Sequence, residues 1–322
     1  MKRFIIPTLL ITFLIFGGIF WWNQNNKPVS TNESLQSFII PKGYSASQIG
    51  NKLEDQNLIN SALAFKFYAQ VTSKSKKIQA GEYLLSPSFS LFKVVNQLTS
   101  GPVEEWVTIP EGLRREEVVE KYISVLKRNE ADAEVFRQDF LAITVNKEGF
   151  LFPDTYLFPK DITPKQIITA MVNQFRTTFR DEWEIQAKTL GFTMHEIITL
   201  ASIIEKETGV ASERPVIASV FHNRLKKNMR LESDPTVIYG IKDFNGNITK
   251  KDLQRLTPYN TYMVSGLPPG PIANPGAESI KAALFPAKTN YLYFVAKFNK
   301  THQFSSTLTD HNRAVRKYQL KR

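Results

Sequence analysis

The chain has 322 residues, a length typical of about two domains, and 42% of its residues are hydrophobic while 22% are charged. This balance indicates a globular protein, and the absence of cysteine excludes disulfides and thiolate metal sites. The net charge of +11 would suggest nucleic acid as the partner of a cytosolic protein. Outside a membrane, the same charge fits anionic lipid head groups or an anionic wall polymer better.

Residues 4–22 form an uncharged stretch that follows Lys2 and Arg3. As a helix it would span roughly 28 Å, about the thickness of one hydrocarbon core. Positive charge before the stretch, and Trp21 and Trp22 at its far end, are typical of an anchor with its N-terminus in the cytoplasm. A cleaved signal peptide is the alternative, but no small-residue cleavage site follows. We therefore predict a cytoplasmic tail at 1–3, a single-pass membrane anchor at 4–22, and the rest of the chain outside the cytoplasm.

A polar linker at 23–36 leads into a small α+β module at 37–101. It begins with a short β run and a Pro-x-Gly turn, followed by predicted helices at 45–56, 61–71 and 91–99 and a short strand at 81–85. A similar strand, turn and helix recur at 107–127. The module loosely resembles a LysM-type glycan-binding domain, and a spacer that holds the next domain off the membrane is the alternative.

Residues 102–322 are expected to form a second, larger α+β domain. Residues 148–156 are rich in aromatics and turns, which suits either a sugar-binding cleft or an ordinary core corner. The expected elements that follow are helices at 164–190, 194–208 and 216–225, a helix beginning at 233–236, and a strand at 291–295. The basic end of the chain, 313–322, is expected to be a solvated helix face. The overall fold class is therefore α+β.

The helix at 194–208 carries two acids at its end, Glu205 and Glu207. Three or four positions before Glu207 the residues are apolar, whereas Glu205 shares its face with Ser202. Glu207 is therefore the better candidate for a desolvated carboxyl that stays protonated near neutral pH and acts as a general acid. Gly209 is expected to end this helix as its C-cap. The alternative for the two acids is that both glutamates are solvated at the helix end. The apolar pattern is formed by Ile197, Ile198, Leu200, Ala201, Ile203 and Ile204.

Other chemistries lack support in the sequence. His195 and Glu196 begin like a zinc-protease helix, but Thr199 stands where the second histidine ligand is needed. There is no cysteine nucleophile and no Gly-x-Ser-x-Gly motif. We expect no metal and no cofactor.

Six motifs in order resemble those of the endolytic murein transglycosylases, the MltG (YceG-like) family. The resemblance runs from the anchor to nearly the C-terminus, which makes it specific. It implies a membrane enzyme of the bacterial envelope that cuts MurNAc-β-1,4-GlcNAc bonds within glycan strands and leaves 1,6-anhydro-MurNAc ends. The motifs are residues 148–156, 201–208, 211–214, 233–240, 259–262 and 266–270.

The resemblance also assigns residues and partners. It places the catalytic acid at Glu207, followed by Thr208 where other lytic transglycosylases have Ser or Thr. It implies peptidoglycan strands as substrate, the inner membrane as location, and coupling to peptidoglycan synthases (penicillin-binding proteins), with no nucleic acid partner. Cleavage beside these synthases would set the length of the glycan strands. The supporting or substrate-binding candidates within the motifs and beside them are Glu205, Glu213, Arg214, Asn223, Asp234, Thr236, Tyr239, Asn260 and Tyr262.

Three mechanisms stay open at this point. In a lytic transglycosylase, Glu207 alone would act as acid and then as base. A hydrolase would need a second carboxylate near it, from Glu205, Glu213 or Asp234. A non-catalytic wall-binding scaffold would function without Glu207, and the polar candidates would then form a hydrogen-bond network at the helix end.

Overall fold

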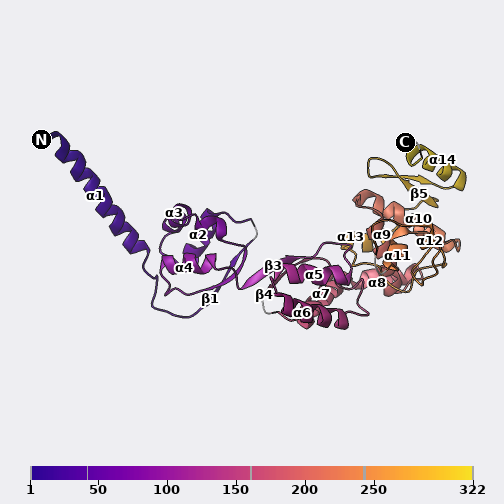
Figure 1. Ribbon diagram of the computed structural model, residues 1–322, viewed down its shortest axis with the longest axis horizontal. Helices are drawn as coiled ribbons and strands as arrows, with labels where there is room; N and C mark the ends of the chain where they lie inside the picture. The colour runs from indigo at the N-terminus through magenta and orange to yellow at the C-terminus, as the bar shows by residue number, and fades with distance from the viewer. Residues whose placement is uncertain (1, 42, 160–161, 242–243, 321–322) are drawn as a thin grey trace. The chain divides into compact units, whose positions relative to one another are not determined.

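The computed structural model describes residues 2–41, 43–159, 162–241 and 244–320, and the side chains of residues 2–12 and 14 lie outside its description (Figure 1). The chain forms two compact units, which are described separately. The first comprises Met1–Val107 with Tyr156–Asp161, and the second comprises Thr108–Thr155 with Ile162–Arg322. Helices and small two-stranded sheets make up both, which confirms the α+β class.

Helix α1 spans Lys2–Asn25. Within the part of the chain that the structure describes, no helix combines the length and the apolar character that crossing a bilayer requires. The predicted anchor at 4–22 includes the side chains of 4–12 and 14, which lie outside the described residues. The anchor therefore stays a prediction of the sequence.

The first unit builds its core around one antiparallel pair of strands. Phe38 on β1 lies opposite Tyr83 on β2, and both side chains are fully buried. Serines at positions 45, 61 and 90 begin the three helices, each accepting a hydrogen bond from a backbone N–H of the first turn. The helices and the strand predicted at 81–85 are confirmed, while the LysM likeness stays a prediction. The elements are β1 (Gln36–Ile40), α2 (Ala46–Asp55), α3 (Ala62–Val71), η1 (Lys74–Lys77), β2 (Gly81–Leu85) and α4 (Leu91–Thr99).

The second unit is centred on helix α9 (Met194–Glu207), whose residues from Ile197 to Ile204 are all buried. It packs against α8, α10, α11 and α13, which surround it in Figure 1. The other helices are α5 (Arg115–Val125), α6 (Glu130–Ile143), α7 (Pro164–Thr178), α8 (Asp181–Thr189), η2 (Ala211–Glu213), α10 (Arg214–Lys226), α11 (Asp234–Tyr239), α12 (Lys250–Leu253), α13 (Ala277–Leu284) and α14 (Leu308–Tyr318).

Two short sheets complete the fold. Strands β3 (Glu104–Thr108) and β4 (Thr155–Pro159) pair with one another. Strands β5 (Tyr293–Ala296) and β6 (His302–Ser305) form an antiparallel hairpin on which α14 packs. The strand predicted at 291–295 is therefore confirmed, although it begins two residues later.

Two predicted helix boundaries are wrong. The single helix expected at 164–190 is broken into α7 and α8, because Phe179 leaves the helical conformation and is buried against the edge of Trp183. The expected C-cap at Gly209 is also absent. Helix α9 ends at Glu207, where Thr208 turns into an extended conformation and its hydroxyl accepts a hydrogen bond from the N–H of Val210.

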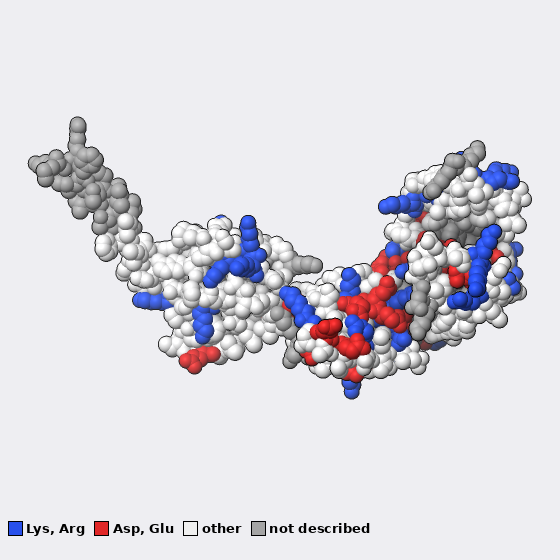
Figure 2. Space-filling model, in the orientation of Figure 1, with Lys and Arg blue, Asp and Glu red and all other residues white. Residues whose placement is uncertain are grey.

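Charge is distributed unevenly over the surface. Figure 2 shows Asp and Glu side chains gathered over part of the second unit, while Lys and Arg side chains are spread over both units. Among the described residues of this face, the positive charge thus forms no single broad patch of the kind that duplex nucleic acid binds.

Candidate active site

Helix α9 holds its C-terminal acids rigidly. At its start, Thr193 and Glu196 form a reciprocal capping box with the backbone. In its middle, the Ser202 hydroxyl accepts a hydrogen bond from the N–H of Ile272 at 3.0 Å. A helix buried along its length and tied at both places fixes the direction in which Glu207 emerges.

Glu207 emerges into a cavity of about 450 Å³. One wall is formed by the ends of α9 and α10 and the start of α11, and the other by β5, β6 and α14. The cavity therefore lies between a polar surface, formed by the ends of α9 and α10 and the start of α11, and a surface from the C-terminal part of the chain. The first of these is called the floor of the cavity. Its lining residues are Glu207, Arg224, Leu231, Glu232, Asp234, Tyr262, Phe294, Val295, Ala296, His302, His311, Val315 and Gln319.

The environment of Glu207 favours its protonated form. The hydroxyl of Ser233 donates a hydrogen bond to its Oε1 at 2.5 Å. Burial raises the pKa of Glu207 to about 7, the bond from Ser233 lowers it, and the charges of Asp234 and Arg224 raise and lower it respectively. A carboxyl with this pKa can both give and take a proton near neutral pH.

Arg224, near the end of α10, forms hydrogen bonds with several backbone segments at the floor of the cavity. Its guanidinium donates to the backbone carbonyl of Leu292 at 2.7 Å and to those of Arg230 and Leu231 at 3.0 Å. It also bonds the carboxylate of Glu232 at 3.0 Å. Arg224 is not among the residues predicted from the sequence, although its position on the apolar face of the predicted helix at 216–225 was an available signal.

Asp234 and Tyr262, two of the supporting residues proposed from the sequence, both line this cavity. The hydroxyl of Tyr262 donates to Oδ1 of Asp234 at 2.7 Å. Thr236 lies below them, fully buried, and its hydroxyl donates to the Ser233 carbonyl at 2.6 Å. Asn260 holds the loop before Tyr262 by donating to three carbonyls and accepting from the Tyr262 N–H.

Thr236 and Asn260 lie outside this lining, and so do five other predicted residues, Glu205, Glu213, Arg214, Asn223 and Tyr239. Glu205 is bound to Arg214 at 3.2 Å and accepts from the N–H of Gly276 at 2.9 Å. Asn223 donates to the carbonyls of residues 289 and 291, both at 3.0 Å. Glu213 bonds the Nδ1 of the lining residue His302 at 2.7 Å and so borders the cavity. The lining residues that sequence reasoning missed, besides Arg224, include Glu232, His302 and His311.

The YceG-like family model matches residues 38–317. The chain belongs to the YceG-like family. It is 36% identical over 333 residues to the endolytic murein transglycosylase of Bacillus subtilis, an alignment that covers 95% of this chain and 91% of the relative.

A more distant relative and a solved structure also match this chain. The endolytic murein transglycosylase of Streptococcus pneumoniae D39 is 28% identical over 359 residues, and the alignment covers 96% of this YceG-like chain but 65% of the relative. The crystal structure of a YceG-like protein from Listeria monocytogenes matches with a TM-score of 0.61 and 36% identity, covering 87% of this chain and 99% of that one.

A second buried carboxyl of this YceG-like chain, Glu148, lies behind α11. It accepts hydrogen bonds from the Asn274 amide at 2.8 Å, the Arg115 N–H at 3.2 Å and the hydroxyl of Tyr239 at 3.3 Å. Burial raises the pKa of Glu148 to about 7, the nearby Glu116 raises it further, and the bond from Arg115 lowers it. Tyr239 thus anchors the far end of α11 and does not line the Glu207 cavity.

The Glu148 carboxyl should make stability depend on pH. Its pKa in the folded chain is about 7, above the ordinary value of 4.5, so its stabilising contribution is present below about pH 4.5 and is lost as the pH rises through 7. Glu148→Gln keeps the shape and the hydrogen bonds without the charge. Urea unfolding at pH 5 and pH 7.5 should therefore show a smaller loss of unfolding free energy in the variant than in the wild type; an equal loss would contradict the assignment.

Across residues 2–41, 43–159, 162–241 and 244–320, no group of three or more His, Asp or Glu side chains is arranged to hold a metal ion. His311 at the cavity wall instead stacks on the ring of Tyr293, with 5.2 Å between ring centroids.

Proposed function

We propose that this chain is an endolytic murein transglycosylase that cuts MurNAc-β-1,4-GlcNAc bonds within glycan strands and leaves 1,6-anhydro-MurNAc ends. The observation that carries the proposal is Glu207, a half-buried carboxyl with a pKa of about 7 at the wall of an open cavity. The names of the Bacillus and Streptococcus relatives support the same reaction.

The reaction needs one group that first gives and then takes a proton. Glu207 protonates the glycosidic oxygen as the bond from that oxygen to C1 of MurNAc breaks. The resulting carboxylate takes the proton from the C6 hydroxyl of the same sugar, whose oxygen forms the new bond to C1. No water is consumed, and Glu207 ends the cycle protonated as it began.

The neighbours of Glu207 suit these two steps. Ser233 occupies Oε1, which leaves Oε2 to exchange the proton with the sugar. The cation of Arg224 stabilises the carboxylate after it has given its proton. Asp234, held by Tyr262, supplies negative charge where an oxocarbenium-like sugar would develop positive charge.

A hydrolase with two carboxylates is the second candidate, and one observation favours it. Of the three acids considered as partners, only Asp234 lines the cavity with Glu207. Glu205 is held by Arg214, and Glu213 by His302. Asp234 would then activate a water, and the product would carry a reducing end.

Mass spectrometry of the products separates the two reactions. Purified peptidoglycan is digested by the full-length chain in detergent, and the new glycan ends are identified. Anhydro-MurNAc ends, one water lighter than reducing ends, are expected. Reducing ends alone would contradict the transglycosylase and assign Asp234 as the second acid.

Ser233→Ala should shift the pH dependence of the reaction. The bond from Ser233 lowers the pKa of Glu207, so its removal raises that pKa and keeps the general acid protonated at higher pH. The alkaline limb of the cleavage-rate profile should move to higher pH, measured from pH 5 to 9. An unchanged or lowered limb would show that this limb does not report Glu207.

We further propose that the chain is held in the bacterial cytoplasmic membrane by residues 4–22 in a single pass, with the second unit outside the cytoplasm. The support is the uncharged sequence from Phe4 to Trp22, which follows Lys2 and Arg3. There it would cut nascent strands beside peptidoglycan synthases and end their elongation. Protease added to intact spheroplasts should degrade the second unit; full protection would contradict this orientation.

A further inference from the structure

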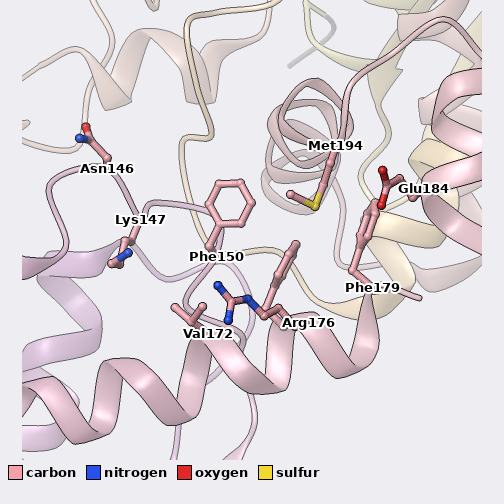
Figure 3. Close-up of a pocket in the computed structure, with 9 residues that line it drawn as sticks. Asn146, Lys147, Phe150, Val172, Arg176, Phe179, Glu184 and Met194 are labelled. Carbon is pink, nitrogen blue, oxygen red and sulfur yellow. The ribbon is translucent and has the colours of Figure 1, made fainter. Parts of the chain in front are cut away.

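The second unit carries another cavity, of about 410 Å³, near the opposite end of α9 from Glu207 (Figure 3). It lies between the turn that precedes residue 150, helix α7, and the starts of α8 and α9. None of its residues belongs to the Glu207 cavity, so the proposed reaction does not account for it. The lining is Asn146, Lys147, Phe150, Val172, Phe175, Arg176, Phe179, Glu184 and Met194.

The cavity has a fixed aromatic wall. Phe150 meets Phe175 edge-on with 5.0 Å between ring centroids, and Phe175 stacks on Phe179 at 5.7 Å. Phe175 and Phe179 are buried, whereas the side chain of Met194 is 39% exposed at the rim. The wall is therefore prebuilt and leaves apolar surface open to small apolar groups.

Two cations, Lys147 and Arg176, line this cavity. Figure 3 shows Arg176 extending from α7 toward the side where Phe150 and Lys147 lie. Among the described residues, neither Arg176 nor Lys147 forms a salt bridge. The one acid of the lining, Glu184, is already bound to Lys188 at 2.8 Å. The cavity therefore complements a ligand that carries carboxylates beside small apolar groups.

We propose that this cavity binds the peptide stems of peptidoglycan, an inference that rests on the proposed function. Stem peptides combine free carboxylates with alanine methyl groups, the two features that the cations and the aromatic wall match. Met194 and Glu207 begin and end α9, so about 20 Å of helix separates the cavity from the acid. An extended stem of five residues reaches roughly 17 Å, less than this span, so the stems bound here would belong to sugars further along the strand than the bond that is cut. Stem binding would select strands that still carry their peptides.

Direct binding tests the cavity without requiring any reaction. The probe is a synthetic stem pentapeptide, L-Ala-γ-D-Glu-L-Lys-D-Ala-D-Ala, titrated into the full-length chain in detergent by calorimetry. Arg176→Ala and Lys147→Ala should each weaken binding by about tenfold or more. Arg180→Ala, which removes an exposed cation outside the lining, is the matched control and should bind like the wild type.

Kinetics on two substrates tests the consequence for the reaction. With peptide-bearing strands, Arg176→Ala should raise KM severalfold and leave kcat unchanged. With strands stripped of peptides by an amidase, Arg176→Ala and the wild type should behave alike. A purely structural loss in the variant would lower cleavage of both substrates equally and would overturn the proposal.

Failure of the inference can be told from failure of the proposed function. If the wild type cleaves both substrates equally and does not bind the pentapeptide, the inference is wrong while the function stands. If neither substrate is cleaved, the function is wrong, and the titration still decides the cavity. Displacement of the peptide by equimolar inorganic phosphate would overturn the inference in favour of a simple anion site. Self-association of the chain that Arg176→Ala abolishes would overturn it in favour of a contact between copies.

Discussion

Replacing Glu207 with glutamine should lower the rate of glycan cleavage by about 10²–10⁴-fold. Glutamine keeps the size of the side chain and can still accept the hydrogen bond from Ser233, but it cannot give and take the proton. Cleavage is followed by mass spectrometry of released anhydro-MurNAc fragments, with thermal unfolding measured in parallel to show that the fold is intact.

The matched control for Glu207→Gln is Glu182→Gln, an exposed acid in the first turn of α8. It removes the same charge outside the cavity and should cleave at the wild-type rate. A fully active Glu207→Gln would contradict the acid assignment and favour the wall-binding scaffold. An inactive variant with a lowered unfolding temperature would call for Ser233→Ala to separate chemistry from folding.

Arg224→Ala should destabilise the second unit by about 3 kcal/mol or more. The substitution removes the donor shared by the carbonyls of Arg230, Leu231 and Leu292, of which the bond to Leu231 is fully buried, and leaves these acceptors without it. Urea unfolding measures the loss as a lower midpoint. Cleavage should fall as well, because Leu231 and Glu232 would no longer hold the cavity floor.

Lys226→Ala provides the comparison for Arg224→Ala. Lys226 is exposed in the last turn of the same helix, so its loss should change the unfolding free energy by about 0.5 kcal/mol or less. A loss of unfolding free energy below about 1 kcal/mol for Arg224→Ala would mean that water replaces the guanidinium at the carbonyls that Arg224 binds.

Local patterns in the sequence predicted much of the fold. The apolar spacing from Ile197 to Ile204 predicts α9 and the emergence of Glu207 at its end. The helices of the first unit are likewise expected from the sequence, and the structure begins each of them at a serine. The sequence did not predict the break between α7 and α8 at Phe179, because the burial of the Phe179 ring against Trp183 outweighs the helical propensity of the segment around it.

The site was less predictable, because its contacts join distant parts of the chain. Asn223 and Asp234 look equally suited to bind a sugar in the sequence, yet Asn223 bonds carbonyls of residues 289 and 291 while Asp234 opens into the cavity. Periodicity carries no information on which far carbonyl needs a donor. The part that each supporting candidate plays in the reaction stays a prediction.

The cavity faces Glu207 with a wall made by β5, β6 and α14, which follow one another near the C-terminus. The acid and the surface opposite it are therefore encoded in separate stretches of the gene. Exchange of the stretch from Tyr293 to Tyr318 between relatives would alter the shape offered to the sugar while the proton-transfer group keeps its buried helix. The shape of the sugar-facing wall can thus change through this stretch alone, without any change in the helix that supplies the acid.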